Sequence, residues 1–131
     1  MKNKSTSPTA AELAVLQLLW QRGPLSVKDV HEALDSDKPV VYTTVLKTMQ
    51  VMMEKEMLDR TSAGRKHIYR AILEQDATQD TLLDSFLDKT FGGSAKSLVM
   101  RALGKHTPSA DEIDELKAFL DQLEGDENTK S

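Results

Sequence analysis

Hydrophobic residues in the first part of the chain recur at the three- and four-residue spacing of helices. Thr9 to Glu12 has the pattern of a capping box, and the apolar residues after it predict a first helix that stops at Gly23-Pro24. Ser26 can cap a second helix, from Val27 to about Leu34. The third helix is expected from about Val41 to Met57. We therefore expect three short amphipathic helices in succession.

The third helix is expected to pack with one face and to present the other to solvent. At about 100° per residue, its packing arc comprises Tyr42, Val45, Leu46, Met49, Met52 and Met53. The opposite side carries Thr43, Thr44, Lys47, Thr48, Gln50, Val51 and Glu54. This outward face is polar and rich in threonine, so it can meet a polar partner.

A change of period after the third helix predicts a β-hairpin. Residues 58–72 leave the helical period, His67 to Arg70 alternate as a strand does, and Ser62 to Arg65 form a turn candidate in which Gly64 can supply a positive φ. Arg60 lies on one arm, and Arg65 and Lys66 lie at the turn. The hairpin should therefore have a basic tip.

The rest of the chain predicts three more helices. The first starts at about Ala77 and stops at Gly92-Gly93. The second is capped by Ser94 and ends at Gly104. The third begins with a capping box from Ser109 to Glu112. Their apolar stripes are Leu82, Leu83, Phe86, Leu87 and Phe91, then Leu98, Val99, Ala102 and Leu103, then Ile113, Leu116, Phe119, Leu120 and Leu123. Helices this short make little core alone, so we expect them to pack on a partner chain, with packing onto residues 1–72 as the alternative.

This order of elements predicts a mainly α-helical chain with a small β-hairpin. The fold class is a winged helix-turn-helix followed by a C-terminal helical dimerisation domain. The expected divisions are a disordered N-terminus over 1–8, a winged-helix DNA-binding domain over 9–74, a three-helix dimerisation domain over 75–124 and a disordered tail over 125–131.

Composition narrows the possible chemistry. The 131 residues include no cysteine, which excludes disulfides, thiol catalysis and thiolate metal sites. His31, His67 and His106 lack metal-binding spacing, so we expect no metal, no cofactor and no enzyme activity. No apolar run approaches the ~20 residues of a membrane span, and no secretory signal opens the sequence. We expect a cytoplasmic protein without direct membrane insertion.

Charge is distributed unevenly along the chain, whose formal net charge is −4. Residues 1–75 carry 11 basic and 9 acidic side chains, and residues 76–131 carry 6 basic and 12 acidic ones. Within residues 38–70, seven basic side chains face three acidic ones. This basic stretch coincides with the third helix and the hairpin, and its alternative interpretation is an ordinary solvated surface.

The residues by themselves favour binding to double-stranded DNA. In a winged helix-turn-helix, the first residues of the helix after the turn meet base edges in the major groove. Thr43, Thr44, Lys47 and Thr48 lie there, and threonine and lysine can contact bases or phosphates. The alternative is a winged-helix module that docks on a protein and binds no DNA.

Several segments, in order, also carry a resemblance to a known family. They are Glu12–Trp20, Val27–Val30, Tyr42–Met49, Glu54-Lys55 with Leu58, Gly64–Tyr69, Gly92–Ser94 with Ser97–Val99, and Glu112–Leu120. Over about residues 9–123 the sequence resembles the penicillinase-repressor family, the BlaI/MecI/CopY group of bacterial transcriptional repressors.

The resemblance implies a homodimeric repressor that binds an inverted-repeat operator. Combined with the patterns above, it assigns DNA contacts to Tyr42, Thr43, Thr44, Lys47, Thr48, Arg60, Arg65 and Lys66. The dimer interface is expected to include Leu82, Leu83, Phe86, Leu87, Phe91, Leu98, Val99, Leu116, Phe119 and Leu120. A membrane sensor-protease is a further expected partner, because family members are typically derepressed by cleavage in the dimerisation segment.

Three features depart from the family pattern. Glu56 stands where the family usually has Gly; there it would cost about 1 kcal/mol or would extend the helix and change the angle of the wing. The expected cleavage region is Met100, Arg101 and Ala102, and Arg101-Ala102 replaces the Asn-Phe bond of well-known members, which leaves proteolytic induction open. The absence of cysteine excludes the copper-thiolate mechanism of copper-responsive members.

Overall fold

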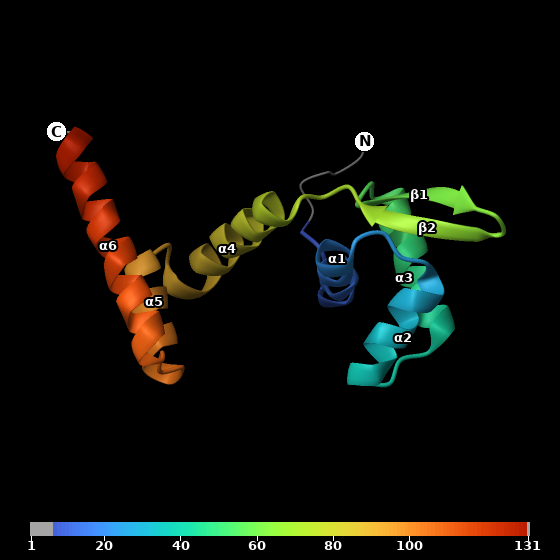
Figure 1. Ribbon diagram of the computed structural model, residues 1–131, viewed down its shortest axis with the longest axis horizontal. Helices are drawn as coiled ribbons and strands as arrows, with labels where there is room; N and C mark the ends of the chain where they lie inside the picture. The colour runs from blue at the N-terminus through green and yellow to red at the C-terminus, as the bar shows by residue number, and fades with distance from the viewer. Residues whose placement is uncertain (1–6, 131) are drawn as a thin grey trace. The chain divides into compact units, whose positions relative to one another are not determined.

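The computed structural model describes the backbone of residues 7–130 and the side chains of residues 7–126. The elements are α1 (Ala10–Arg22), α2 (Val27–Asp37), α3 (Tyr42–Glu54), β1 (Leu58–Ala63), β2 (Lys66–Ala71), α4 (Gln75–Phe91), α5 (Ala95–Lys105) and α6 (Ala110–Lys130). This confirms the expected fold class, a winged helix-turn-helix with C-terminal helices (Figure 1). The expectation of a disordered N-terminus over 1–8 falls mostly on residues 1–6, outside the described residues.

Local side-chain hydrogen bonds start α1 and α2 where the sequence predicts. Thr9 and Glu12 form the expected capping box, with the Glu12 amide donating to Thr9 Oγ1 at 3.2 Å and the Thr9 amide donating to Glu12 Oε1 at 2.9 Å. Ser26 caps α2 by accepting from the Asp29 amide at 3.1 Å. Gly23 ends α1 with a φ of 83°, a value that favours glycine. The start and end of α1 are therefore decided within a few residues of the chain.

One hydrophobic core joins the first three helices to the hairpin. Its buried residues are Val15, Leu16, Leu19, Val27, Val30, Val45, Met49, Met52, Met57, Leu58 and Tyr69. The Leu25 backbone bridges to Tyr69 through two hydrogen bonds of 2.8 and 3.0 Å, which attach β2 to the helices. Trp20 Nε1 donates to the Leu73 carbonyl at 2.9 Å, so α1 also holds the chain where it leaves the hairpin.

The hairpin pairs β1 with β2 from Leu58↔Ala71 to Ala63↔Lys66. Gly64 and Arg65 form the two-residue turn, in which Gly64 has a φ of 67° and Arg65 has no positive φ. That pattern is the one of a type II′ turn, whose first central position takes glycine. The predicted role of Gly64 is confirmed, and the hairpin projects from the helices at the right of Figure 1.

The end of α3 differs from its expected position near Met57. The helix ends at Glu54, and Glu56 adopts a left-handed backbone with a φ of 66°. The Glu56 amide donates to the Met53 carbonyl at 3.1 Å, and the Met57 amide donates to the Met52 carbonyl at 2.9 Å. This pair of bonds is a Schellman motif, which usually holds glycine at the left-handed position. Glu56 therefore stops the helix as a glycine would, at a cost of about 1–2 kcal/mol.

Four other helix boundaries also differ from the expected ones. The second helix continues to Asp37 instead of Leu34, and the fourth starts at Gln75 instead of Ala77. Helix α5 continues through Gly104, and α6 continues through Gly125. A glycine inside a helix costs only about 1 kcal/mol relative to alanine, so neighbouring helical hydrogen bonds can carry the helix past it. Residues 125–130, expected as a disordered tail, are therefore helical.

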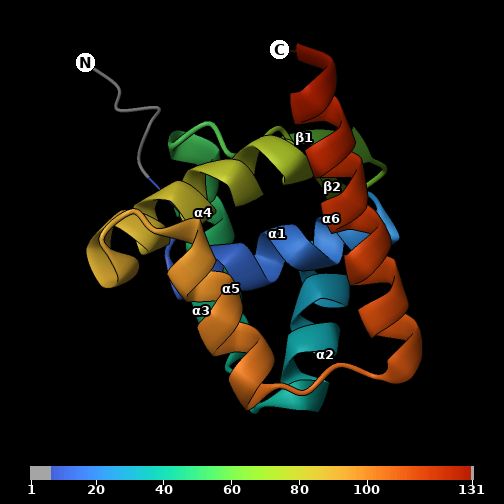
Figure 2. The ribbon, with the colours of Figure 1, turned by 90° about the vertical axis from the view of Figure 1, so that its left-hand side faces the viewer.

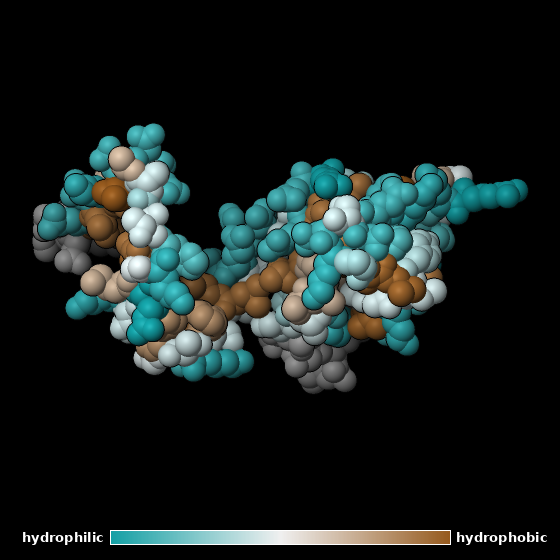
Figure 3. Space-filling model, turned by 90° about the horizontal axis from the view of Figure 1, so that it is seen from below, coloured by the Kyte–Doolittle hydropathy of each residue, from teal (hydrophilic) through white to brown (hydrophobic). Residues whose placement is uncertain are grey.

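The chain divides into two compact units, Met1–Asp84 and Ser85–Ser131, and the boundary falls within α4. In the second unit, no side chain described between residues 85 and 126 is buried. Figure 2 shows α5 and α6 diverging from the short connection 106–109. Hydrophobic side chains lie open on these helices, at the left of Figure 3. Within the described residues, no helix has the length and hydrophobicity to cross a membrane.

Candidate nucleic-acid interface

Packing of α3 determines which of its side chains face outward. Val45, Met49 and Met52 are buried in the core at 0–3% exposure. On the opposite side, Thr43 and Lys47 are exposed, one helical turn apart. The predicted division holds for these residues, but Tyr42, expected on the packing arc, is 43% exposed, and Thr48 and Val51, expected on the outward side, are half-buried.

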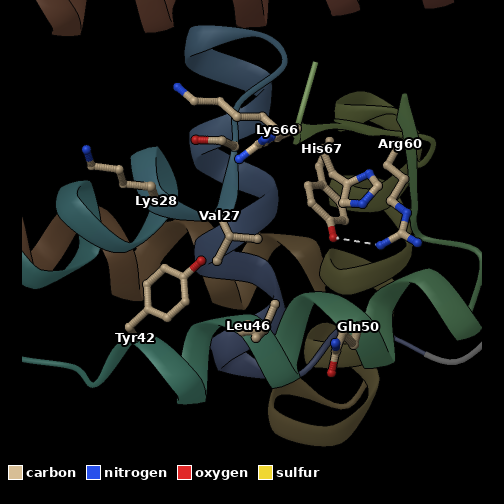
Figure 4. Close-up of a pocket in the computed structure, with 11 residues that line it drawn as sticks. Val27, Lys28, Tyr42, Leu46, Gln50, Arg60, Lys66 and His67 are labelled. Carbon is tan, nitrogen blue, oxygen red and sulfur yellow. Dashed lines mark hydrogen bonds between the residues drawn. The ribbon is translucent and has the colours of Figure 1, made fainter. Parts of the chain in front are cut away.

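A second surface of α3 faces the hairpin. Tyr42, Leu46 and Gln50 follow each other at four-residue intervals and line one side of a groove of about 420 Å³. The hairpin contributes further lining residues, and α2 contributes Val27 and Lys28 (Figure 4). The hairpin residues are Arg60, Arg65, Lys66, His67 and Tyr69. We call this hollow the wing groove. Four predicted DNA contacts line it, namely Tyr42, Arg60, Arg65 and Lys66.

Thr44 and Thr48 lie on a different side of α3 from the wing groove. They line a separate hollow of about 440 Å³ together with residues of α1, among them Ala10 and Ala14. Thr48 Oγ1 donates to the Thr44 carbonyl at 2.9 Å, so the Thr48 hydroxyl proton is already engaged within the helix. The structure therefore does not bring all five predicted α3 contacts to one surface.

The first turn of α3 is held by the connection from α2. Val41, the N-cap residue, makes no side-chain capping hydrogen bond. The Val40 amide instead donates to Asp35 Oδ1 at 3.0 Å, and the Val40 carbonyl lies 2.8 Å from His31 Nε2. The His31 ring also meets Tyr42 edge-on, with centroids 5.5 Å apart. These contacts orient the turn that precedes the predicted base-contacting residues.

Some cations of the basic stretch, residues 38–70, are engaged by other side chains of the protein, and others are not. Lys55 Nζ donates to Glu12 Oε2 at 2.8 Å, and Arg70 Nη2 donates to Asp59 Oδ2 at 3.0 Å. Arg60 Nη1 donates to the Tyr69 hydroxyl at 3.2 Å, shown dashed in Figure 4, and Arg60 Cζ lies 6.0 Å from the centroid of the Tyr69 ring. The remaining cations, for which the described part of the chain contains no ion pair, are Lys38, Lys47, Arg65 and Lys66.

The two ion pairs affect their carboxyl groups. Burial opposes ionisation of Glu12, but hydrogen bonds from Lys55 and Thr9 outweigh it and hold the pKa of this carboxyl below its usual value. The hydrogen bond from Arg70, together with the Arg60 amide, lowers the pKa of Asp59, which is exposed. Both carboxylates are therefore anionic at neutral pH. Glu12 neutralises Lys55 and Asp59 neutralises Arg70, although the charge count along residues 38–70 included both cations among those available to DNA.

Exposed polar residues of the wing groove that sequence reasoning missed are Lys28, Gln50 and His67. Gln50 lies on the outward arc of the third helix, so its position on the wheel already gave a signal. Lys28 gave none, because only the fold brings the start of α2 beside the hairpin. Within the described residues, no group of three or more His, Cys, Asp or Glu side chains could hold a metal ion.

The expected interface and cleavage residues belong to the C-terminal helices. Phe86, Val99, Phe119 and Leu120 are 49–61% exposed, and Leu83 and Leu116 are 48% and 38% exposed. The half-buried members are Leu82, Leu87, Phe91 and Leu98. Met100, Arg101 and Ala102 lie within α5, where Met100 is 66% exposed.

Comparisons with known proteins agree with this fold. A family model described as penicillinase repressor matches residues 8–122. The chain is 24% identical to a penicillinase repressor of Staphylococcus aureus, over 94% of the chain and 98% of that protein. It is 30% identical to the transcriptional regulator BlaI of Mycobacterium tuberculosis, over 86% of the chain and 82% of that protein.

Two solved structures share the fold. The DNA-binding domain of the repressor BlaI aligns with a TM-score of 0.51 at 20% identity, covering 57% of this chain and 90% of that one. A transcriptional regulator from Thermotoga maritima aligns with a TM-score of 0.53 at 14% identity, covering 94% and 80%.

The three helices and the hairpin define a winged-helix protein. The chain belongs to the penicillinase repressor family, because the family model spans most of its length. It is therefore a DNA-binding transcriptional repressor and not an enzyme. Membership also decides against the alternative of a docking module that binds no DNA.

Proposed function

We propose that the protein represses transcription as a homodimer bound to an inverted-repeat operator. Residues 9–74 would contact DNA, and residues 75–124 would hold the two copies together. Because a two-fold dimer presents the same surface twice, its operator would consist of two matching half-sites. A repressor acts on the chromosome, which in bacteria lies in the cytoplasm.

In this proposal α3 enters the major groove of each half-site. Thr43 and Lys47 are exposed opposite the buried side of the helix, which is where base-contacting residues belong. Lys47 can serve a guanine edge, and the methyl and hydroxyl groups of Thr43 suit a thymine or a phosphate. Arg65 and Lys66, at the tip of the hairpin, would meet the DNA backbone or the minor groove.

Dimerisation is supported by the apolar surface of the C-terminal helices. Large hydrophobic side chains on all three helices are open to solvent in the single chain, among them Phe86, Val99 and Phe119. Surface of this kind is typical of a subunit interface, and none of the side chains described over residues 85–126 is buried in the single chain. A second copy would cover it and would remove its apolar area from water.

We also propose that derepression acts by separating the two copies, through a membrane sensor-protease or another sensor. Met100, Arg101 and Ala102 lie inside α5, so a protease would have to unwind this helix before cutting it. Since α5 buries none of its side chains in the single chain, opening it there would disrupt little packing. Loss of the dimer would leave each half-site with one weakly bound copy.

The single observation that carries the proposal is that exposed cations surround α3 and the hairpin while unpartnered apolar helices follow in the same chain. The test is a gel shift with the promoter DNA beside the protein's own gene, measured over a series of salt concentrations. We expect a sequence-specific complex with two chains, which weakens as salt rises. A folded dimer that gives no specific shift even at low salt would refute it.

A further inference from the structure

We infer that the wing groove seats the sugar–phosphate backbone of one DNA strand, with Lys28 of α2 and Lys66 of β2 as phosphate contacts on its two walls. The inference rests on the proposed binding of operator DNA. It adds α2 to the DNA-binding surface, alongside the α3 and hairpin contacts that the sequence predicts.

The composition of the groove fits a strand backbone better than it fits bases. Its most buried residues are mainly apolar: Val27 and Tyr69 are 7% and 2% exposed, Leu46 is half-buried, and Ser26, at 5%, is the polar member. Its outer residues, Lys28 and Lys66, are exposed cations. A strand backbone carries anionic phosphates, which exposed lysines at the edges of a groove can neutralise.

The two lysines reach the groove from different elements. Figure 4 shows Lys28 extending from α2 and Lys66 from the hairpin, and Tyr42 turning its hydroxyl towards Val27. Neither lysine forms an ion pair with any side chain described in the structure, so both ammonium groups are available to an anion. Arg60 differs, because its guanidinium is engaged with the Tyr69 hydroxyl.

The position of the groove also fits a strand that borders the major groove. Tyr42, Leu46 and Gln50 form its α3 wall, next to the outward side that carries Thr43 and Lys47. With α3 in the major groove, the DNA strand that borders this groove would pass between α3 and the hairpin. Contacts to that backbone position the protein but carry no base sequence.

The first experiment compares Lys28→Ala with the wild-type protein in operator binding over 50–200 mM salt. Loss of one phosphate contact should make the slope of log affinity against log salt shallower by about one. Between 50 and 200 mM salt, the affinity of the variant should therefore fall by a factor about threefold smaller than that of the wild type. Operator and unrelated DNA should lose affinity equally. Lys89→Ala on α4 removes the same charge from an exposed position outside the groove and should leave the slope unchanged.

The second experiment locates the groove on DNA. Because the chain contains no cysteine, Lys28→Cys and Lys66→Cys each introduce a single attachment point for an iron–EDTA cleavage reagent. The two proteins should cut the same strand at overlapping nucleotides, and Lys89→Cys should not cut there.

The outcomes separate this inference from the proposed function. If wild-type protein binds the operator but Lys28→Ala keeps the full salt slope, or if positions 28 and 66 cut different strands, the groove does not seat a strand. A loss confined to particular base sequences would place Lys28 on a base edge and would overturn the inference too. Failure of the wild-type protein to bind any operator would instead refute the proposed function.

Discussion

Lys55 Nζ donates to Glu12 Oε2 at 2.8 Å, which ties the residue that follows α3 to the first turn of α1. Glu12 is only 4% exposed, and its other carboxylate oxygen accepts from the Thr9 amide. One carboxylate therefore caps α1 and also holds the point where α3 ends. Because β1 starts shortly after Lys55, this ion pair also ties the chain to α1 just before the hairpin begins.

The first prediction concerns this ion pair. Lys55→Met should lower the free energy of unfolding by about 1–3 kcal/mol, because it leaves the buried Glu12 carboxylate without its charged donor. Chemical denaturation measures the loss. Glu54→Gln changes an exposed neighbour and should alter stability by less than about 0.5 kcal/mol. If Lys55→Met lowers the free energy of unfolding no more than Glu54→Gln does, the ion pair does not stabilise the protein.

The second prediction is a dependence of stability on pH. The pKa of Glu12 is lower in the folded protein than its ordinary value of 4.5, so its contribution is present above that value and disappears as pH falls through the lower folded pKa. The stability difference between wild type and Glu12→Gln should therefore be constant at neutral pH and shrink below about pH 4.5. Urea denaturation at a series of pH values gives this difference, in which the titration of Asp59 cancels. A difference that grows as pH falls would contradict it.

The third prediction concerns the left-handed backbone of Glu56, whose φ is 66°. Glu56→Gly should be more stable than Glu56→Ala by about 1 kcal/mol, because both remove the same side chain and only alanine keeps the strain. Thermal unfolding compares the two variants. At Glu54, inside α3, the order should reverse, with alanine the more stable. The same order at both positions would be evidence against strain at residue 56.

The fourth prediction separates base contacts from backbone contacts. Lys47→Ala should weaken binding to the operator more than to unrelated DNA, because Lys47 lies on the outward side of α3. Lys66→Ala should weaken both equally and lower the salt slope by about one. Fluorescence anisotropy with the two DNAs tests this. A change of sequence preference in Lys66→Ala would assign the hairpin a different role.

The fifth prediction concerns assembly. Phe86→Asp and Leu120→Asp place a charge among side chains that are 51% and 61% exposed in the single chain, so each should yield folded monomers if a second copy covers them. Sedimentation velocity reports the mass, and operator affinity should fall with it. Gln122→Asp adds the same charge to an exposed polar site of α6 and should leave a dimer. A dimer that survives both substitutions would put the interface elsewhere.

Much of the candidate site follows from the sequence, but the availability of its charges does not. The stretch of residues 38–70 contains seven cations, of which Lys55 and Arg70 form ion pairs and Arg60 bonds to a tyrosine. Their partners include Glu12, 43 residues from Lys55. Lys28, which lies outside this stretch, joins the wing groove instead. Counting charges along a segment therefore located the basic surface without identifying which cations are free to act.

The sequence by itself determined the elements whose cause is local. Thr9, Ser26 and Ser109 start helices through hydrogen bonds that span three residues, and Gly64 makes the turn of the hairpin because it adopts a positive φ. Tertiary structure decided what depends on distant contacts: the ion pair that neutralises Lys55 and the groove that Lys28 shares with the hairpin. Those outcomes depend on packing between segments far apart in the chain, which no short window of sequence contains.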